Sequence, residues 1–142
     1  ANGWEKAGLR DLLIQEFRPY AEDRLRMEGP EVTLGAEQSL SMGLILHELV
    51  TNAAKYGPLK CPSEAAGWVD VRWSAVDADG RITLDWVEHG GPVVAPPTRS
   101  GFGSRLIDVS IRTTLAGSAT MDYADGRLHC RLVFRPGGEP KV

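Results

Sequence analysis

Three polar residues in one apolar stretch have the types and spacing for phosphate and metal chemistry. Glu48, Asn52 and Lys55 lie in a run that begins near Leu40 and ends at Gly57-Pro58, as a helix ends. At about 100° per residue, these three side chains fall within roughly one 60° arc. Carboxylate and amide oxygens are hard ligands that suit Mg²⁺, and a lysine ammonium meets phosphate as a point charge. The stretch therefore predicts a helix that binds a negatively charged ligand, with a metal.

The rest of that helix must hold the polar residues in place. We expect it to span 36–57, with Thr33 or Gly35 at its start. Its apolar side, opposite the polar arc, consists of Met42, Leu46, Leu49, Val50 and Ala53.

Patterns elsewhere predict two more helices and several strands. An amphipathic helix is expected from Trp4 to Tyr20, stopped at Pro19, and another over 104–115. Period-two alternation predicts three sets of strands. Two short strands are expected within 24–34, on either side of a turn at 28–30. One hairpin is expected from 68–74 with 81–88, and a second from 118–123 with 128–134. Helices and hairpins are mixed rather than strictly alternating. We therefore expect an α+β fold with a mostly antiparallel sheet.

Composition excludes several classes of protein. The chain has 142 residues, 42% of them hydrophobic and 25% charged, which is typical of one globular domain. A net charge of −3 gives no reason to expect nucleic acid or an anionic membrane as partner. Cys61 and Cys130 match no metal-ligand spacing and are interpreted as reduced thiols of a cytoplasmic protein. No apolar run approaches a membrane span.

Two further blocks follow the helix, and together the three resemble a known family. They are Trp86-Val87-Glu88 and Ser100-Gly101-Phe102-Gly103-Ser104-Arg105-Leu106-Ile107. The helix resembles the N-box of the histidine-kinase ATP-binding domain (the Bergerat fold). Its His47 and the Trp-x-Glu block resemble the HWE subfamily of bacterial sensor kinases. The last block resembles the family's second glycine box.

The resemblance implies a two-layer fold and assigns roles on the helix. It implies a sheet backed by helices over residues 1–136, with 137–142 a frayed tail, and ATP held between the long helix and a loop. Asn52 would coordinate Mg²⁺ directly, and Glu48 would assist through water or as a base. Lys55 would contact a phosphate, and Tyr56 would also contact the nucleotide.

The Trp-x-Glu block would hold the base. At the end of its strand, Glu88 would accept a hydrogen bond from the adenine amino group, and Gly90 would permit close backbone approach. The wider family has Asp-x-Gly-x-Gly here, and this sequence departs from it with Glu88 and with Gly91-Pro92. Trp86 is assigned to packing, with aromatic contact near the base as the alternative.

The second glycine box would hold phosphate. Gly101, Phe102 and Gly103 precede a helix, so backbone N–H groups would cradle phosphate there. Ser104 would cap that helix, and Arg105 would add a phosphate contact. Phe102 would anchor the loop 90–100 as an ATP lid.

None of the three histidines is expected to be the phosphoacceptor. His47 lies inside the ATP-binding box, where a structural hydrogen bond is its expected role, whereas His89 and His129 are expected on loop and strand surface. In the family the acceptor belongs to a separate dimerisation helix, so the chain is expected to bind ATP without labelling itself.

The resulting hypothesis is the catalytic domain of a two-component sensor kinase. It would present the γ-phosphate of Mg-ATP to a histidine on the dimerisation domain of the same parent protein, and a response regulator would receive the phosphate next. Two alternatives remain open. One is an ATPase or serine kinase of the same fold, of the anti-sigma-factor type, in which Glu48 activates water or a hydroxyl. The other is a degenerate module that docks a partner without nucleotide.

Overall fold

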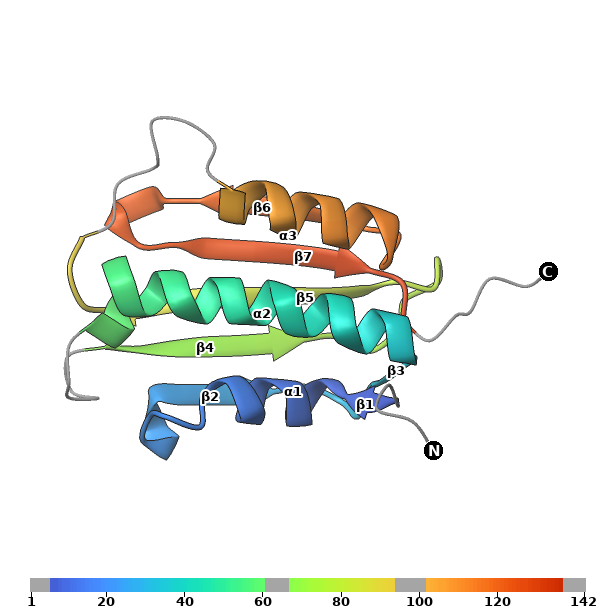
Figure 1. The fold of residues 1–142 in the computed structure, drawn as a ribbon, viewed down its shortest axis with the longest axis horizontal. Coiled ribbons are helices and arrows are strands. Elements are labelled where there is room, and N and C mark those ends of the chain that lie inside the picture. The colour runs from blue at the N-terminus through green and yellow to red at the C-terminus, as the bar shows by residue number, and fades with distance from the viewer. Residues whose placement is uncertain (1–5, 61–66, 94–101, 137–142) are drawn as a thin grey trace.

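Within the part of the chain that the structure describes, the protein forms two layers, which are a mixed sheet and three helices that cover one of its faces (Figure 1). This computed structural model describes residues 6–60, 67–93 and 102–136. The predicted α+β class is confirmed, with helices packed on a sheet that is antiparallel except at one strand pair.

The main sheet has five strands in the order β2-β4-β5-β7-β6. These strands are β2 (Leu25–Glu28), β4 (Gly67–Trp73), β5 (Ile82–Gly90), β6 (Ser118–Asp122) and β7 (His129–Phe134). Both predicted hairpins are confirmed, because β4 pairs antiparallel with β5 and β6 pairs antiparallel with β7. At the first hairpin turn the Asp77 carboxylate accepts hydrogen bonds from the backbone N–H groups of Asp79 and Arg81, both at 2.9 Å.

The helices are α1 (Leu9–Glu16), α2 (Ala36–Tyr56) and α3 (Phe102–Thr113). In Figure 1, α2 crosses the middle of the sheet between α1 and α3, and its C-terminal half lies beside the start of α3. The predicted apolar side of α2 is buried as expected, from Met42 to Ala53. Together with inward-facing residues of β4, β5 and β7, it forms one continuous core.

Three short 3₁₀ turns complete the described chain, and they are η1 (Glu22–Arg24), η2 (Pro58–Lys60) and η3 (Ala124–Gly126). The last of these forms the second hairpin turn. There Asp125 and Gly126 adopt positive φ angles of 59° and 71°, a conformation in which Asp and Gly are enriched.

The N-terminal third differs from the prediction in two ways. The first helix is shorter than 4–20, because α1 begins at Leu9 after strand β1 (Ala7–Gly8), while Trp4 lies outside the described residues. The two short strands within 24–34 exist as β2 and β3 (Thr33–Leu34), but they do not pair with each other. Strand β2 runs parallel to β4, and β3 pairs with β1.

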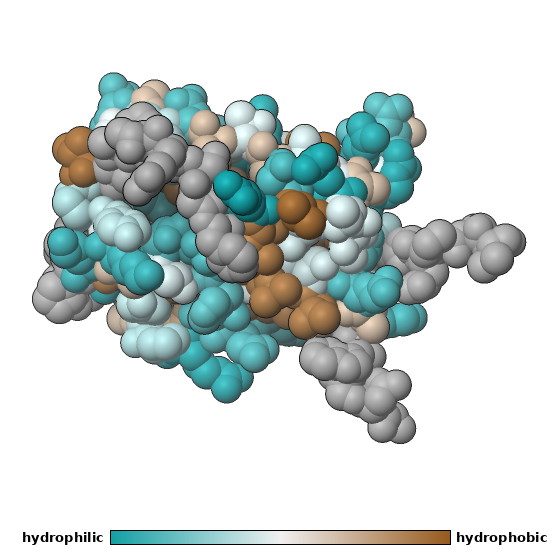
Figure 2. Space-filling view, turned by 45° about the horizontal axis from the view of Figure 1, so that its top comes forward, coloured by the Kyte–Doolittle hydropathy of each residue, from teal (hydrophilic) through white to brown (hydrophobic). Residues whose placement is uncertain are grey.

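The surface of the helical layer is polar with some apolar positions. Figure 2 shows apolar side chains gathered among polar ones on the face it displays. Large exposed apolar residues of the three helices include Ile14, Leu40, Leu44 and Val109. Within the described ranges, no helix combines the length and apolar character that crossing a membrane requires.

Candidate functional site

The polar edge of α2 faces the α3 side of the helical layer. His47 points to the other side, because its Nδ1 lies 2.9 Å from Glu16 Oε1 of α1. Glu48 and Asn52 are turned a further 100° and 140° around the helix, and both are half-buried. Lys55 and Tyr56 are exposed at the C-terminal end. The predicted set thus forms an edge that leads toward the first turn of α3.

Glu88 is a buried carboxylate at the end of β5. Its side chain is 4% exposed, and its Oε2 accepts a hydrogen bond from Trp86 Nε1 at 3.1 Å. Burial raises the pKa of Glu88 to about 7, and the bond from Trp86 opposes part of that rise. A carboxyl group balanced between two protonation states at neutral pH is typical of a functional site.

Gly57 brings Glu88 and the end of α2 together. A Cβ atom at Gly57 would lie only 2.7 Å from Glu88 Oε1. The φ angle of Gly57 is −121°, so close approach rather than a left-handed conformation explains the glycine. The structure therefore places Glu88, the base-binding candidate from β5, beside Gly57, the residue that follows α2.

Gly90, the last residue of β5, and Gly91, which follows it, have positive φ angles of 74° and 71°. The prediction placed the end of this strand at Glu88, so the strand ends two residues later than expected. At Gly91 a Cβ atom would lie 2.5 Å from Pro58 Cα. Gly91 therefore allows the chain after β5 to pass directly over the turn that follows α2.

Arg24 is a buried residue that the sequence analysis did not identify. Its Nε donates to Gly67 O at 2.8 Å and its Nη2 donates to Pro58 O at 2.9 Å. It ties the turn after α2 to the start of β4 and supports the same end of the sheet. These contacts span 43 and 34 residues, so no local pattern marks this arginine.

The second glycine box is described in part. Gly101 lies outside the described residues, and so do positions 94–100 of the predicted lid. Helix α3 begins at Phe102, so the assignment of Ser104 as N-cap is wrong, since Gly103 and Ser104 already lie within the helix. Arg105 is exposed on the first turn of α3.

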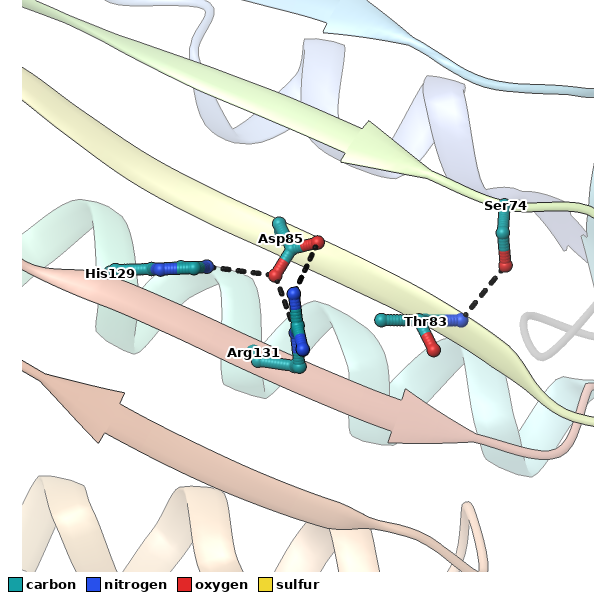
Figure 3. Close-up of polar contacts among 5 residues, drawn as sticks. All are labelled: Ser74, Thr83, Asp85, His129 and Arg131. Atoms are coloured by element: carbon teal, nitrogen blue, oxygen red, sulfur yellow. Dashed lines mark hydrogen bonds and ion pairs between the residues drawn. The ribbon is translucent and has the colours of Figure 1, made fainter.

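All three histidines pair with carboxylates and none points toward this site. His47 binds Glu16 as described, which agrees with the expected structural hydrogen bond. His89 lies within β5, where it pairs with Asp70 at 2.9 Å, so its assignment to a loop is wrong. His129 binds Asp85 at 2.8 Å beside Arg131, on the face of the sheet opposite the helices (Figure 3).

Alternation along β5 separates the two faces of the sheet. Trp86 and Glu88 point into the helical layer, so Asp85 and His89 point to the opposite, open face. On that face the His89 ring stacks on Trp68 with ring centroids 5.1 Å apart. The histidines of β5 and β7 are therefore separated from Glu88 by the sheet itself.

The residues present fit a cation that is held mostly by its ligand. Among the described residues, no group of three or more His, Cys, Asp or Glu side chains forms a metal site. Mg²⁺ commonly uses one or two protein oxygens and completes its shell with phosphate and water. Asn52 and Glu48 match that donor set.

Known proteins with similar sequences are histidine kinases. The chain is 38% identical over 136 residues to blue-light-activated histidine kinase 1 of Erythrobacter litoralis, which covers 92% of this chain and 36% of the relative. It is 38% identical over 113 residues to a blue-light-activated histidine kinase of Brucella anthropi, covering 78% of this chain and 22% of that protein. The chain thus spans about a third or less of these relatives. No protein-family model matches it.

Solved structures show the same fold. The histidine kinase domain of the Erythrobacter litoralis EL346 blue-light-activated kinase matches 90% of this chain and 59% of that chain, with a TM-score of 0.65 at 15% identity. The catalytic domain of histidine kinase ThkA matches 97% of this chain and all of that chain, with a TM-score of 0.65 at 13% identity.

The sequence relatives assign the chain to the histidine kinases, and its fold is that of a histidine kinase catalytic domain. The chain belongs to the HWE type within this family, with His47 on α2 and the Trp86-Val87-Glu88 signature on β5.

Proposed function

We propose that this domain binds Mg-ATP and presents its γ-phosphate to a histidine on a separate dimerisation domain of the same parent protein. The observation that carries this proposal is the meeting of Glu88 with the end of α2 at Gly57. At this contact a buried carboxylate, which can accept a hydrogen bond from adenine, meets the end of the helix whose polar edge suits phosphate and metal. A cytoplasmic location and a response regulator as the next acceptor belong to the same proposal.

The base would lie near Glu88. A buried ionised carboxylate accepts hydrogen bonds strongly, and the 6-amino group of adenine is a donor. Gly57 and Gly90 leave the surrounding backbone free of side chains. The adenine end of the nucleotide would therefore occupy the junction of β5 and α2.

The phosphates would lie between α2 and the start of α3. Lys55 supplies one positive charge, and Arg105 supplies another on the facing helix. The first turn of α3 offers unpaired backbone N–H groups and the positive end of the helix dipole. We assign phosphate contacts to this turn, from Gly101 to Arg105, and nucleotide contact to Tyr56.

Asn52 would bind the metal and Glu48 would order its water shell or act as a base. When bound, Mg²⁺ neutralises charge that develops on the phosphates during transfer. The half-buried position of both side chains limits their motion, so they remain oriented toward the phosphate site. Phosphoryl transfer depends mainly on such positioning and charge neutralisation.

The acceptor must come from elsewhere. His47 is directed toward α1, while His89 and His129 lie on the open face of the sheet. The shared region makes up 36% and 22% of the two relatives, so most of each relative lies outside it and leaves room for an acceptor domain.

Calorimetric titration with ATP, with and without Mg²⁺, tests this function. We expect magnesium-dependent binding that Asn52→Ala weakens. Thr51→Ala is the matched control, because Thr51 lies on the same helix but is turned about 100° away from Asn52. No binding at millimolar ATP, or equal binding by Asn52→Ala and the control, would contradict the proposal.

A further inference from the structure

We propose that Trp86 is a positioning residue for base recognition, whose indole N–H occupies one oxygen of Glu88 and leaves the other to read the base. The inference rests on the proposed function, and it adds a residue whose role there is neither packing alone nor contact with the nucleotide.

The two oxygens of Glu88 have different surroundings. Oε2 accepts the hydrogen bond from Trp86 Nε1 at 3.1 Å, whereas Oε1 faces Gly57 at the end of α2. The backbone of Glu88 is also fixed, because its N–H donates to Leu128 O at 3.0 Å. The carboxylate is thus held at both its main chain and one oxygen, with Oε1 directed to the nucleotide side.

The core prevents the indole from moving. Trp86 has no exposed surface, and its ring lies against Phe17 with centroids 5.8 Å apart and an interplanar angle of 44°. A well-packed aromatic ring holds its rotamer, so the position of the N–H is set by packing. Packing of the Trp86 ring therefore fixes the direction in which its N–H donates to Glu88.

The indole N–H decides which oxygen of Glu88 can carry a proton. An indole N–H only donates, so Oε2 must remain an acceptor. A proton on Glu88 is then confined to Oε1, where it turns the base-reading oxygen from an acceptor into a donor. The ionised carboxylate favours a 6-amino base, and the protonated carboxyl favours a 6-oxo base.

Other titratable groups near Glu88 do not interfere near neutral pH. Among the described residues, Tyr123 and Cys130 sense its charge from the β6–β7 side. Burial raises the pKa of both groups, that of Cys130 to about 12, so both stay neutral. From α2 the close neighbour is Gly57, which carries no charge.

Carboxyl NMR of the nucleotide-free protein gives the first test. We expect Trp86→Phe to raise the pKa of Glu88, because the bond that favours the ionised form is lost. Trp73→Phe is the matched control, since its indole N–H donates to Pro30 O at 2.7 Å, away from Glu88. In the wild-type protein, the Trp86 indole resonance should titrate with the same midpoint as Glu88, a measurement that does not depend on how the variants fold.

Calorimetry with ATP and ITP at pH 6 and 8.5 gives the second test, since these nucleotides differ in the 6-position group. We expect Trp86→Phe to weaken ATP binding by about tenfold at pH 6 and less at pH 8.5, because the raised pKa of Glu88 reduces the fraction of ionised carboxylate at pH 6 far more than at pH 8.5. Its preference for ATP over ITP should also fall. A purely structural role would reduce affinity equally at both pH values.

The outcomes separate the two proposals. An unchanged Glu88 pKa in folded Trp86→Phe, or an indole resonance that does not titrate with Glu88, would overturn the positioning role and leave ATP binding intact. Absence of ATP binding by the wild-type protein would overturn the proposed function and base recognition together.

Discussion

Gly57 and Glu88 meet so closely that no side chain fits between them. A Cβ atom on Gly57 would approach Glu88 Oε1 to 2.7 Å and Ala53 Cα to 3.3 Å. Gly57 and Glu88 are 31 positions apart in sequence, yet they bring the end of α2 and the end of β5 together.

Gly57→Ala should weaken ATP binding by about tenfold through displacement of the Glu88 carboxylate, a loss equal to about one hydrogen bond to a charged group. Isothermal calorimetry measures it. Gly43→Ala is the control, because a Cβ there meets nothing within 4 Å. That change should stabilise α2 by up to about 1 kcal/mol and leave affinity unchanged. Equal ATP affinity in Gly57→Ala and wild type would contradict this role.

Glu88→Gln should stabilise the nucleotide-free protein at high pH. Burial raises the pKa of Glu88 from its ordinary value of 4.5 to about 7 in the folded state, so between these two pH values the folded state keeps the proton that the unfolded state has lost. Stability contributed by the neutral form is present below pH 4.5 and is lost as pH rises to 7. The glutamine amide does not ionise, so Glu88→Gln should raise the free energy of unfolding by about 3 kcal/mol at pH 8.

Denaturant unfolding of Glu88→Gln and wild type at pH 4 and pH 8 measures this difference. The two proteins should be nearly equal at pH 4, where Glu88 is already neutral. The same variant should bind ATP more weakly at pH 8, since an amide accepts less strongly than a carboxylate. A stability difference independent of pH would show that Glu88 ionises normally.

Arg24→Met should destabilise the domain by about 2–4 kcal/mol, because the carbonyls of Gly67 and Pro58 lose a charged donor in a buried place. Thermal or urea unfolding measures the loss. The exposed Arg72, whose Nε lies 3.8 Å from Glu28, provides the matched control. Arg72→Met should change the free energy of unfolding by less than about 1 kcal/mol. Similar losses in both variants would contradict the buried role.

Incubation with labelled ATP should leave no stable phosphohistidine on this chain. Each histidine is paired with a carboxylate on a surface away from the proposed phosphate site. Acid-labile label on the wild-type protein that disappears in His47→Gln would contradict this expectation. His47→Gln should otherwise cost less than about 1 kcal/mol of stability, since the side chain is 69% exposed.

Local patterns predicted most elements because each depends on nearby residues. The apolar side and polar edge of α2 follow from its helical period, and the two hairpins follow from alternation around Asp77–Gly80 and Asp125-Gly126. Local patterns could not predict which strands pair with β2 and β3. Their pairing with β4 and β1 depends on how the chain crosses the sheet, which no short period encodes.

The sequence by itself determined the family, the candidate residues and their order along the chain. Only the tertiary structure decided which of them meet. The close approach of Gly57 to Glu88 and the anchoring by Arg24 arise where distant segments pack. Such contacts depend on register and close approach, so they appear only when the complete core is assembled.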